Sequence, residues 1–364
     1  MPTKVLVVDD TIFYRKILKD LLSSIPDVEV VGTANNGKVA LSRLKSLNPD
    51  LLTLDVEMPE MNGLEVLQEV QRQGADIECL MVSSLTQKGS EITVQALSMG
   101  ALDFIAKPDA SSVEENQALL KKAIEPKLRA FHRRRELKNL VKGRPGSPKS
   151  TVSEREVKDF DAVISKSKSA ESRAEKSQAI ALGVSTGGPN ALNKVIPLLR
   201  AGLNVPVFIV QHMPKTFTSS LAQVLNKNSE LEVKEGQNGE LVRPNVVYIA
   251  PGGMQMKVAS GAGGQRIIRV TDDPPENNCK PAVDYLFRSV AREYGSKATA
   301  VVMTGMGSDG KLGVKVMKSA GAICITQNAA TCVVYGMPKA VVDAGMADVV
   351  APLDAIAQEI HKTV

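Results

Sequence analysis

Short apolar runs alternate with amphipathic segments along most of this chain, and this alternation is the feature that most constrains its fold. In the first third, strand-like runs are separated by helical patterns. Those runs are residues 4–10, 28–34, 50–55, 78–84 and 102–105. Buried parallel strands read as near-continuous apolar runs and need helical crossovers between them. We therefore predict that residues 1–125 form an α/β domain of five strand–helix units around a parallel sheet.

A second set of apolar strands begins near Ala179. They read QAIALGVS, VPVFIVQH, NVVYIAP, KATAVVMTG and GAICITQ, with helix-like stretches between most of them. The pattern predicts a second, doubly wound parallel α/β domain at residues 179–364. Residues 126–178 are rich in Lys, Arg, Ser and Glu without apolar periodicity. We predict a basic, mostly flexible linker there, whose first part, residues 127–141, extends the preceding helix.

The positive charge of the chain is concentrated in this linker. Residues 1–125 carry 12 basic and 19 acidic side chains, 126–178 carry 15 and 7, and 179–364 carry 18 and 14, giving −7, +8 and +4. The modest charge of the last segment, which lacks a helix-turn-helix-like end, argues against a nucleic-acid-binding output. No apolar run approaches the roughly 18–20 residues that cross a bilayer, and no signal peptide is evident, so we expect a cytoplasmic protein.

The cysteines predict neither disulfides nor a metal site. Cys79, Cys279, Cys324 and Cys332 form no CxxC pair, and no cluster of histidines accompanies them in the sequence. CxxC pairs and clustered histidines are the usual sequence signs of a zinc site or a disulfide framework. We therefore expect reduced, structural thiols.

Three carboxylates follow strands of the first domain. Asp9 and Asp10 close the first strand and Asp55 closes the third. Because the carboxyl ends of parallel strands open onto one crevice, we expect these side chains to converge. An oxygen-only set suits Mg²⁺, which compensates their charge and that of an incoming phosphoryl group. Ser83 and Lys107, after the fourth and fifth strands, are placed to hold phosphoryl oxygens. The alternative for each acid taken alone is a helix cap.

Three residues of the second domain suit nucleophilic catalysis. Ser185 lies in GVSTG between a strand and a helix, where free N–H groups and the helix dipole favour negative charge. His212 ends the next strand, and Asp309 lies in TGMGSDG after a later strand. A histidine base oriented by a carboxylate activates a serine hydroxyl, and backbone N–H groups such as that of Met306 stabilise an oxyanion. The order Ser, His, Asp differs from that of the α/β-hydrolases, so the GxSxG match does not assign that fold.

Rival interpretations of this domain stay open. GMGSDG at 305–310 satisfies the GxGxxG dinucleotide fingerprint, but the strand some 20 residues later ends in Gln327 without the expected acid. Asp309 could simply cap the next helix, and His212 could be structural. Two other classes of protein are possible for this domain: a DNA-binding regulator and a catalytically dead binding module.

The first domain closely resembles the receiver domain of two-component response regulators, which has a flavodoxin-like fold. The resemblance is carried by Asp9-Asp10, by Asp55 followed by Met58-Pro59 and Gly63, by Ser83-Ser84 and by Lys107-Pro108. It implies that Asp55 is the phosphoacceptor and that Mg²⁺ is held by Asp9, Asp10, Asp55 and the carbonyl of Glu57. It also implies that Ser83, Phe104 and Lys107 transmit the signal.

The whole chain resembles the chemotaxis protein-glutamate methylesterases of bacteria, the CheB family. The motifs are GVSTGGP, QHMP, TDDPP with PAVDYLF, TGMGSDG and VVYGMP after the receiver pattern and the linker. The resemblance implies Ser185 as nucleophile, His212 as general base and acid, and Asp309 as the orienting carboxylate, with Thr186 and Met306 flanking the reacting carbonyl.

The same resemblance implies the reaction and the partners. The reaction is hydrolysis of glutamyl 5-methyl esters on chemoreceptors, joined by deamidation of glutamines, and no cofactor is expected for it. A chemotaxis histidine kinase would donate the phosphoryl group, and we expect no nucleic-acid ligand and no insertion into the membrane. We expect the unphosphorylated receiver to restrict access to Ser185, and phosphorylation of Asp55 to relieve this restriction.

Overall fold

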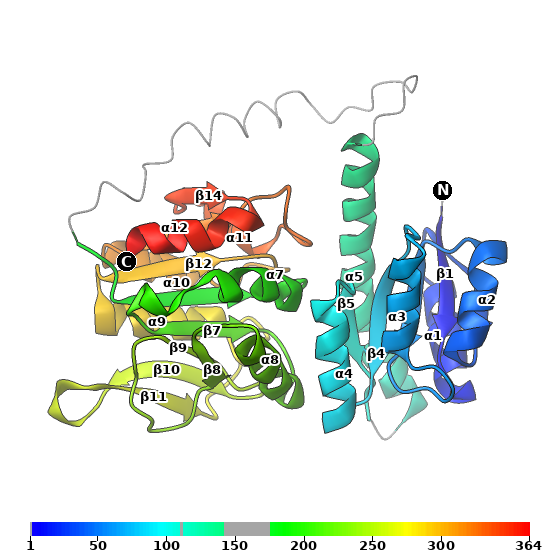
Figure 1. The fold of residues 1–364 in the computed structure, drawn as a ribbon, viewed down its shortest axis with the longest axis horizontal. Coiled ribbons are helices and arrows are strands. Elements are labelled where there is room, and N and C mark those ends of the chain that lie inside the picture. The colour runs from blue at the N-terminus through cyan, green and yellow to red at the C-terminus, as the bar shows by residue number, and fades with distance from the viewer. Residues whose placement is uncertain (1, 110–111, 142–174) are drawn as a thin grey trace. The chain divides into compact units, whose positions relative to one another are not determined.

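The computed structural model describes residues 2–109, 112–141 and 175–364 (Figure 1). The chain divides into two compact units, Met1–Arg133 and Arg134–Val364. Helix α5 (Val113–Val141) runs past the domain end predicted at residue 125, and Pro126 lies inside it. Residues 127–141 thus continue the helix, whereas residues 142–174 of the predicted linker lie outside the described part of the chain.

The first unit is built around a five-stranded parallel sheet in the order β2-β1-β3-β4-β5. The strands are β1 (Thr3–Val8), β2 (Val28–Ala34), β3 (Leu51–Asp55), β4 (Glu78–Ser83) and β5 (Asp103–Ala106). Between them lie α1 (Ile12–Ser23), α2 (Gly37–Leu47), α3 (Gly63–Arg72) and α4 (Gln87–Ser98). This arrangement confirms the predicted fold class of the first domain.

Local sequence fixes where these helices begin. A side chain at each N-cap accepts a hydrogen bond from a first-turn N–H; the caps are Thr11, Asn36, Asn62 and Thr86. The chain enters the sheet at β1, whose neighbours are β2 on one side and β3 on the other. The strand order reverses there, so a crevice is expected at the carboxyl ends of β1 and β3.

The second unit contains a seven-stranded parallel sheet in the order β14-β13-β12-β6-β7-β9-β8. Its strands are β6 (Ala179–Val184), β7 (Val207–Gln211), β8 (Glu232–Glu235), β9 (Val246–Ile249), β12 (Ala298–Val302), β13 (Ile323–Gln327) and β14 (Val349–Ala351). The helices are α7 (Gly188–Val195), α8 (Lys215–Lys227), α9 (Val283–Tyr294), α10 (Lys311–Ser319), α11 (Met337–Val342) and α12 (Ile356–Thr363). Here the order reverses between β6 and β12, which places a second crevice at their carboxyl ends.

Four strands of this unit are not among the five that the sequence predicts. β8 and β14 are short strands at the two sheet edges, so they give little apolar signal. The other two, β10 (Gln255–Ser260) and β11 (Arg266–Thr271), pair antiparallel in a separate ribbon. Each mixes apolar and polar residues without a regular period, so neither gives a clear strand signal in the sequence.

A glycine in β6 determines how closely α9 approaches the sheet. A Cβ at position 183 would collide with the side chain of Val283, the first residue of α9. The buried face of α9 then packs into the core with Leu286, Phe287 and Val290. Gly183 thereby lets the N-terminus of α9 reach the carboxyl end of the sheet, where its free N–H groups become important.

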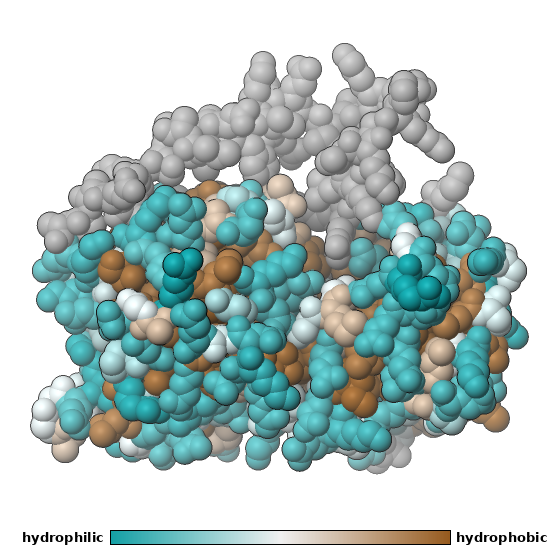
Figure 2. Space-filling model, viewed as in Figure 1, coloured by the Kyte–Doolittle hydropathy of each residue, from teal (hydrophilic) through white to brown (hydrophobic). Residues whose placement is uncertain are grey.

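Apolar side chains of both units lie mostly in these cores. On the face drawn in Figure 2, hydrophilic residues cover most of the surface of each unit, with hydrophobic patches between them. Among the described residues, no helix combines the length and the hydrophobicity that a membrane crossing requires.

Candidate functional site

The acidic residues at the strand ends of the first unit lie together. Asp9 and Asp55 are buried, and oxygens of Asp9, Asp10 and Asp55 lie within 4.8 Å of one another. Lys107 Nζ is 2.8 Å from Asp9 Oδ2 and 2.7 Å from Asp55 Oδ2. Burial, opposed by Lys107 and reinforced by Asp9, raises the pKa of Asp55 to about 7. One ammonium therefore does not compensate the three carboxylates, and the pocket favours a further cation.

The donor set of this pocket fits a hard divalent cation. In the described part of the chain, Asp9 Oδ2 is buried and accepts no hydrogen bond, although it forms the ion pair with Lys107. Carboxylate oxygens are the ligands that Mg²⁺ prefers. The Glu57 carboxylate instead accepts a hydrogen bond from Ser84 Oγ at 2.8 Å. Because the carboxylate is engaged in this way, the backbone carbonyl is the group of Glu57 that could serve as a ligand.

The residues predicted to respond to phosphorylation lie on β4, on β5 and in the loop after β5. Ser83 is fully buried and its hydroxyl donates to the carbonyl of Ser84 at 3.1 Å. The backbone N–H of Lys107 donates to the Ser83 carbonyl at 2.7 Å, which ties the two strand ends together. The Phe104 ring is buried, with Lys127 Nζ 5.9 Å from its centre. The Phe104 ring is therefore largely shielded from solvent and lies near Lys127.

Tyr14 is a further residue of this pocket that the sequence analysis did not single out. Lys107 Nζ lies 4.7 Å from the centre of its ring, and its hydroxyl donates to the carbonyl of Pro108 at 2.8 Å. A cation over an aromatic face is attracted by the ring quadrupole, so Tyr14 helps to hold the lysine over the carboxylates. The available signal was an aromatic residue in the first turn of the helix after Asp9-Asp10.

The three residues predicted for catalysis lie after three strands of the second unit. Ser185 directly follows β6, His212 directly follows β7, and Asp309 lies in the loop after β12. Val184 pairs with Gln211, so Ser185 and His212 occupy matching positions just beyond adjacent strands. The Ser185 N–H donates to the carbonyl of Thr304 at 2.9 Å, which connects the end of β6 to the loop after β12. All three strand ends therefore contribute to one crevice.

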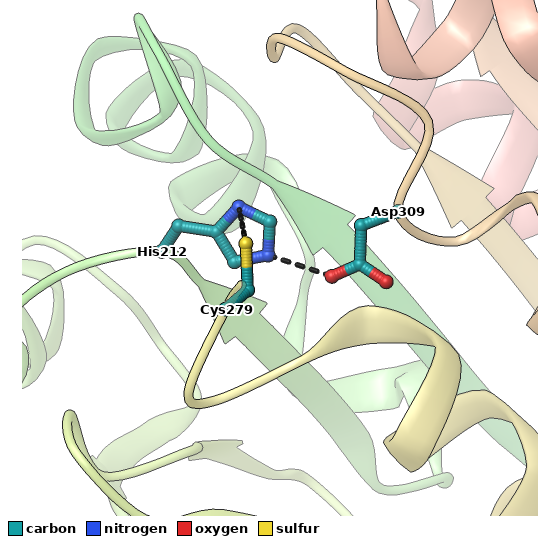
Figure 3. Close-up of side chains that lie close together, drawn as sticks. All are labelled: His212, Cys279 and Asp309. Carbon is teal, nitrogen blue, oxygen red and sulfur yellow. Dashed lines mark hydrogen bonds and ion pairs between the residues drawn. The ribbon is translucent and has the colours of Figure 1, made fainter. Parts of the chain in front are cut away.

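His212 and Asp309 are in direct contact. His212 Nε2 lies 2.8 Å from Asp309 Oδ2 (Figure 3). Burial tends to lower the pKa of His212, but hydrogen bonding to Asp309 and the nearby Cys279 outweigh it and raise the pKa to about 9. Burial would raise the pKa of Asp309, yet the contact with His212 and backbone N–H groups lower it. Asp309 is thus an ionised carboxylate aligned with the imidazole.

Asp309 is held in place by backbone and side-chain donors besides the histidine. Its carboxylate accepts hydrogen bonds of 2.7–3.0 Å from Val283 N, Asp284 N, Gly310 N and Asn277 Nδ2. Two of these N–H groups, those of Val283 and Asp284, belong to the first turn of α9. Asp309 therefore caps α9 and not the next helix along the chain, α10, whose N-cap is Gly310. The helix N-terminus stabilises the negative charge that the histidine needs.

Cys279 occupies the other side of the imidazole. Its Sγ lies 3.6 Å from His212 Nδ1 (Figure 3). The sequence analysis, which looked for a cluster of histidines near the cysteines, did not single out this pair. The two residues are 67 positions apart, so no local spacing indicated the contact. The Ser185 hydroxyl, by contrast, makes no hydrogen bond to His212 or to any other described residue.

The loops around Ser185 leave little free space. Thr304 Oγ1 donates to the carbonyl of Thr186 at 2.9 Å. A Cβ at position 305 would lie 2.8 Å from the Ser185 Cβ and would collide with Met337. Met306, next to Gly305, is 36% exposed at the crevice. Only a glycine at 305 therefore lets the loop after β12 close against the serine.

The dinucleotide interpretation of this glycine-rich loop is disfavoured. The residue at the end of the next strand, Gln327, is fully buried. Its Oε1 accepts from Thr304 N at 2.9 Å and its Nε2 donates to the carbonyl of Thr331 at 2.9 Å. It has no spare group for a ribose, and Gly305 packs against Ser185 instead of leaving room for a pyrophosphate.

Two family models match the chain. Residues 180–360 match the CheB methylesterase and residues 5–118 match the response regulator receiver domain. Proteins named protein-glutamate methylesterase/protein-glutamine glutaminase are similar over the whole length. The one from Desulfotalea psychrophila is 47% identical and that from Bacillus subtilis 42%, each over 99% of this chain and 98% of the relative.

Among the solved structures that are similar to this chain is one that matches the second unit. It is the crystal structure of the CheB methylesterase catalytic domain of Thermotoga maritima, at 40% identity and a TM-score of 0.51. The match covers 52% of this chain and 100% of that domain.

Proposed function

Because this chain belongs to the CheB methylesterase family and carries a response regulator receiver domain, we propose that Ser185, His212 and Asp309 are its catalytic triad, under the control of Asp55. The chain is a hydrolase, a protein-glutamate methylesterase/protein-glutamine glutaminase. The observation that carries our assignment is the 2.8 Å contact between His212 Nε2 and an Asp309 carboxylate held by backbone N–H groups, one strand away from Ser185.

The contact with Asp309 selects the reacting nitrogen of His212. An ionised carboxylate accepts from Nε2–H, so the neutral ring has its lone pair on Nδ1. Nδ1 is then the atom that takes the proton from Ser185 Oγ as this oxygen attacks the ester carbonyl. The Cys279 thiol, which lies 3.6 Å from Nδ1 in the resting arrangement, must give way to the serine hydroxyl.

The rest of the reaction uses the same groups. The oxygen of the tetrahedral intermediate would be stabilised by the backbone N–H groups at Thr186 and Met306. His212 returns the proton to the departing methoxide, and methanol leaves an acyl group on Ser185. Water, deprotonated by His212, then releases the glutamate and restores the serine. A glutamine side chain follows the same course with ammonia as the leaving group.

Phosphorylation of Asp55 is the proposed control. The donor is a chemotaxis histidine kinase, and the substrates are the glutamyl methyl esters of methyl-accepting chemoreceptors, both acting in the cytoplasm. Asp9, Asp10, Asp55 and the Glu57 carbonyl would hold Mg²⁺, which would neutralise charge on the phosphoryl group. Ser83 and Lys107 would bind phosphoryl oxygens, and Phe104 would respond to the movement of Ser83.

Methanol release from radiomethylated receptor membranes tests both sites. The full chain would be compared with Ser185→Ala and Asp55→Asn, each with and without acetyl phosphate and Mg²⁺. We expect no release by Ser185→Ala, and stimulation by acetyl phosphate only where Asp55 is present. Release by Ser185→Ala at the wild-type rate would refute the nucleophile. Equal stimulation of Asp55→Asn would refute the phosphoacceptor.

A further inference from the structure

Two good ligands for a thiophilic metal ion face each other in the hydrolase crevice. Cys279 Sγ lies 3.6 Å from His212 Nδ1 (Figure 3), and the Asp309 carboxylate also lies within 4.8 Å of both groups. Among the described residues only one other such cluster occurs, and it is made of carboxylates alone: Asp9, Asp10 and Asp55. The two clusters differ in chemistry, because thiolate and imidazole suit Zn²⁺ and carboxylates suit Mg²⁺.

The distance between the two atoms matches a shared metal ion. In a tetrahedral zinc site, Zn–S bonds of about 2.3 Å and Zn–N bonds of about 2.0–2.1 Å place the sulfur and the nitrogen about 3.6 Å apart. The sulfur and Nδ1 are already separated by 3.6 Å, so a zinc ion between them requires no large movement of either side chain. A hydrogen bond between the thiol and Nδ1 has the same length, and the cobalt absorption described below distinguishes the two arrangements.

Asp309 completes this arrangement without binding the ion itself. Zinc-binding histidines commonly donate their second ring N–H to a carboxylate, which fixes the ring and makes it a better ligand. His212 does so through Nε2, 2.8 Å from Asp309 Oδ2. The remaining capacity of the Asp309 oxygens is taken by N–H donors, among them Val283 N at 2.7 Å and Gly310 N at 2.9 Å. Cys279 and His212 are both partly exposed, so the ion can reach them and keep water as its other ligands.

We propose that His212 Nδ1 and Cys279 Sγ form an inhibitory site for Zn²⁺ or a similar thiophilic divalent ion. Binding forms one metal–sulfur and one metal–nitrogen bond, with no change of oxidation state. It releases the thiol proton to solvent and, where the ring is an imidazolium, the Nδ1 proton as well. The Nδ1 lone pair is then engaged and cannot accept the proton of Ser185. The existence of the site rests on geometry alone, whereas inhibition also rests on the proposed role of His212.

Zinc titration of the full chain tests the inhibition. Methanol release would be measured at increasing Zn²⁺, with excess Mg²⁺ present to occupy the carboxylate cluster of the receiver. The variants are Cys279→Ser and, as a matched control, Cys332→Ser, which removes a partly exposed thiol that belongs to neither cluster. Each protein is compared with its own activity without zinc, and a chelator is added last to show that inhibition is reversible.

Cobalt provides a readout that does not depend on activity. Co²⁺ bound by a thiolate shows an intense sulfur-to-metal charge-transfer absorption, which oxygen and nitrogen ligands alone do not give. We expect this absorption in the wild type and in Cys332→Ser, and its absence in Cys279→Ser. We also expect the zinc concentration for half inhibition to rise by at least about 10-fold in Cys279→Ser only, because losing a direct ligand costs no less than losing an outer partner of one.

The possible failures can be told apart. Equal zinc sensitivity of Cys279→Ser and the wild type, or no thiolate absorption with cobalt, would overturn the site. Cobalt–thiolate absorption without any loss of methanol release on zinc binding would overturn the inhibition, and with it the role of Nδ1. A wild type that binds cobalt through Cys279 but releases no methanol in the absence of zinc would support the site and refute the proposed function.

Discussion

Replacing Asp309 by asparagine should separate catalysis from folding in the second unit. The carboxylate accepts five hydrogen bonds of 2.7–3.0 Å. The donors are Val283 N, Asp284 N, Gly310 N, Asn277 Nδ2 and His212 Nε2. An amide has one acceptor atom and two N–H groups of its own. In either orientation of the new side chain, N–H groups must therefore face N–H groups.

The consequence for His212 depends on the orientation of the amide. If the NH₂ group takes the Oδ2 position, it faces His212 Nε2, and this nitrogen must then accept a hydrogen bond from it. The ring proton moves to Nδ1, so the ring can no longer take the proton of Ser185 there. If the amide oxygen takes that position, three other donors lose their acceptor and the loop is strained. In a serine protease triad the same substitution lowers kcat about 10⁴-fold. We expect a loss of about 10³- to 10⁴-fold here, which is about 4–5 kcal/mol in the activation free energy.

Folding should suffer less than catalysis. Each buried donor left unpaired costs about 1–3 kcal/mol of unfolding free energy, to be measured by urea denaturation. Asp284→Asn is the matched control, because this buried carboxylate accepts from Gly313 N at 2.6 Å and from Asn277 Nδ2 at 2.9 Å but does not contact His212. Its amide oxygen can keep the bond from Gly313, so we expect methanol release within about threefold of the wild type. Equal losses in both variants, or more than about a tenth of the wild-type rate in Asp309→Asn, would refute the reasoning.

Four further predictions concern proton transfer, stability, packing and control. Because the base must be neutral and its pKa is raised to about 9, kcat/KM should rise with pH up to about 9; a midpoint near the unperturbed value of about 6.5 in a pH profile would contradict this. The same shift of the His212 pKa adds stability that is complete below about pH 6.5 and is lost as pH rises through 9, which urea midpoints at several pH values would show. Gly305→Ala would push the new methyl against Ser185 and should lower kcat about 100-fold, whereas a change within twofold would show that the loop yields easily. Lys107→Ala removes the ammonium 2.7 Å from Asp55 and should abolish the stimulation by acetyl phosphate, measured as the ratio of methanol release with and without it; an unchanged ratio would exclude the lysine from signalling.

The residues at strand ends were predictable from sequence because a single rule places them. Parallel strands end on the same edge of their sheet, so an apolar run followed by a polar residue locates that residue at the crevice. This reasoning predicted that Asp9 and Asp55 lie together, which the structure confirms. It also predicted that His212 and Ser185 follow adjacent strands, and the pairing of Val184 with Gln211 agrees. The short strands were missed for the converse reason. An edge strand of three or four residues gives too few positions for a period to be read.

Beyond Asp309, which the sequence analysis named, the surroundings of His212 depend on contacts that no local pattern encodes. Gly183 leaves room for Val283, and this close packing brings the first N–H groups of α9 to Asp309. The segment that leads into α9 then carries Cys279 to the opposite side of the imidazole. The carboxylate and the thiol that contact His212 thus flank the start of one helix. A change at position 183 that displaced α9 would therefore disturb both nitrogens of His212 together, although Gly183 contacts neither of them.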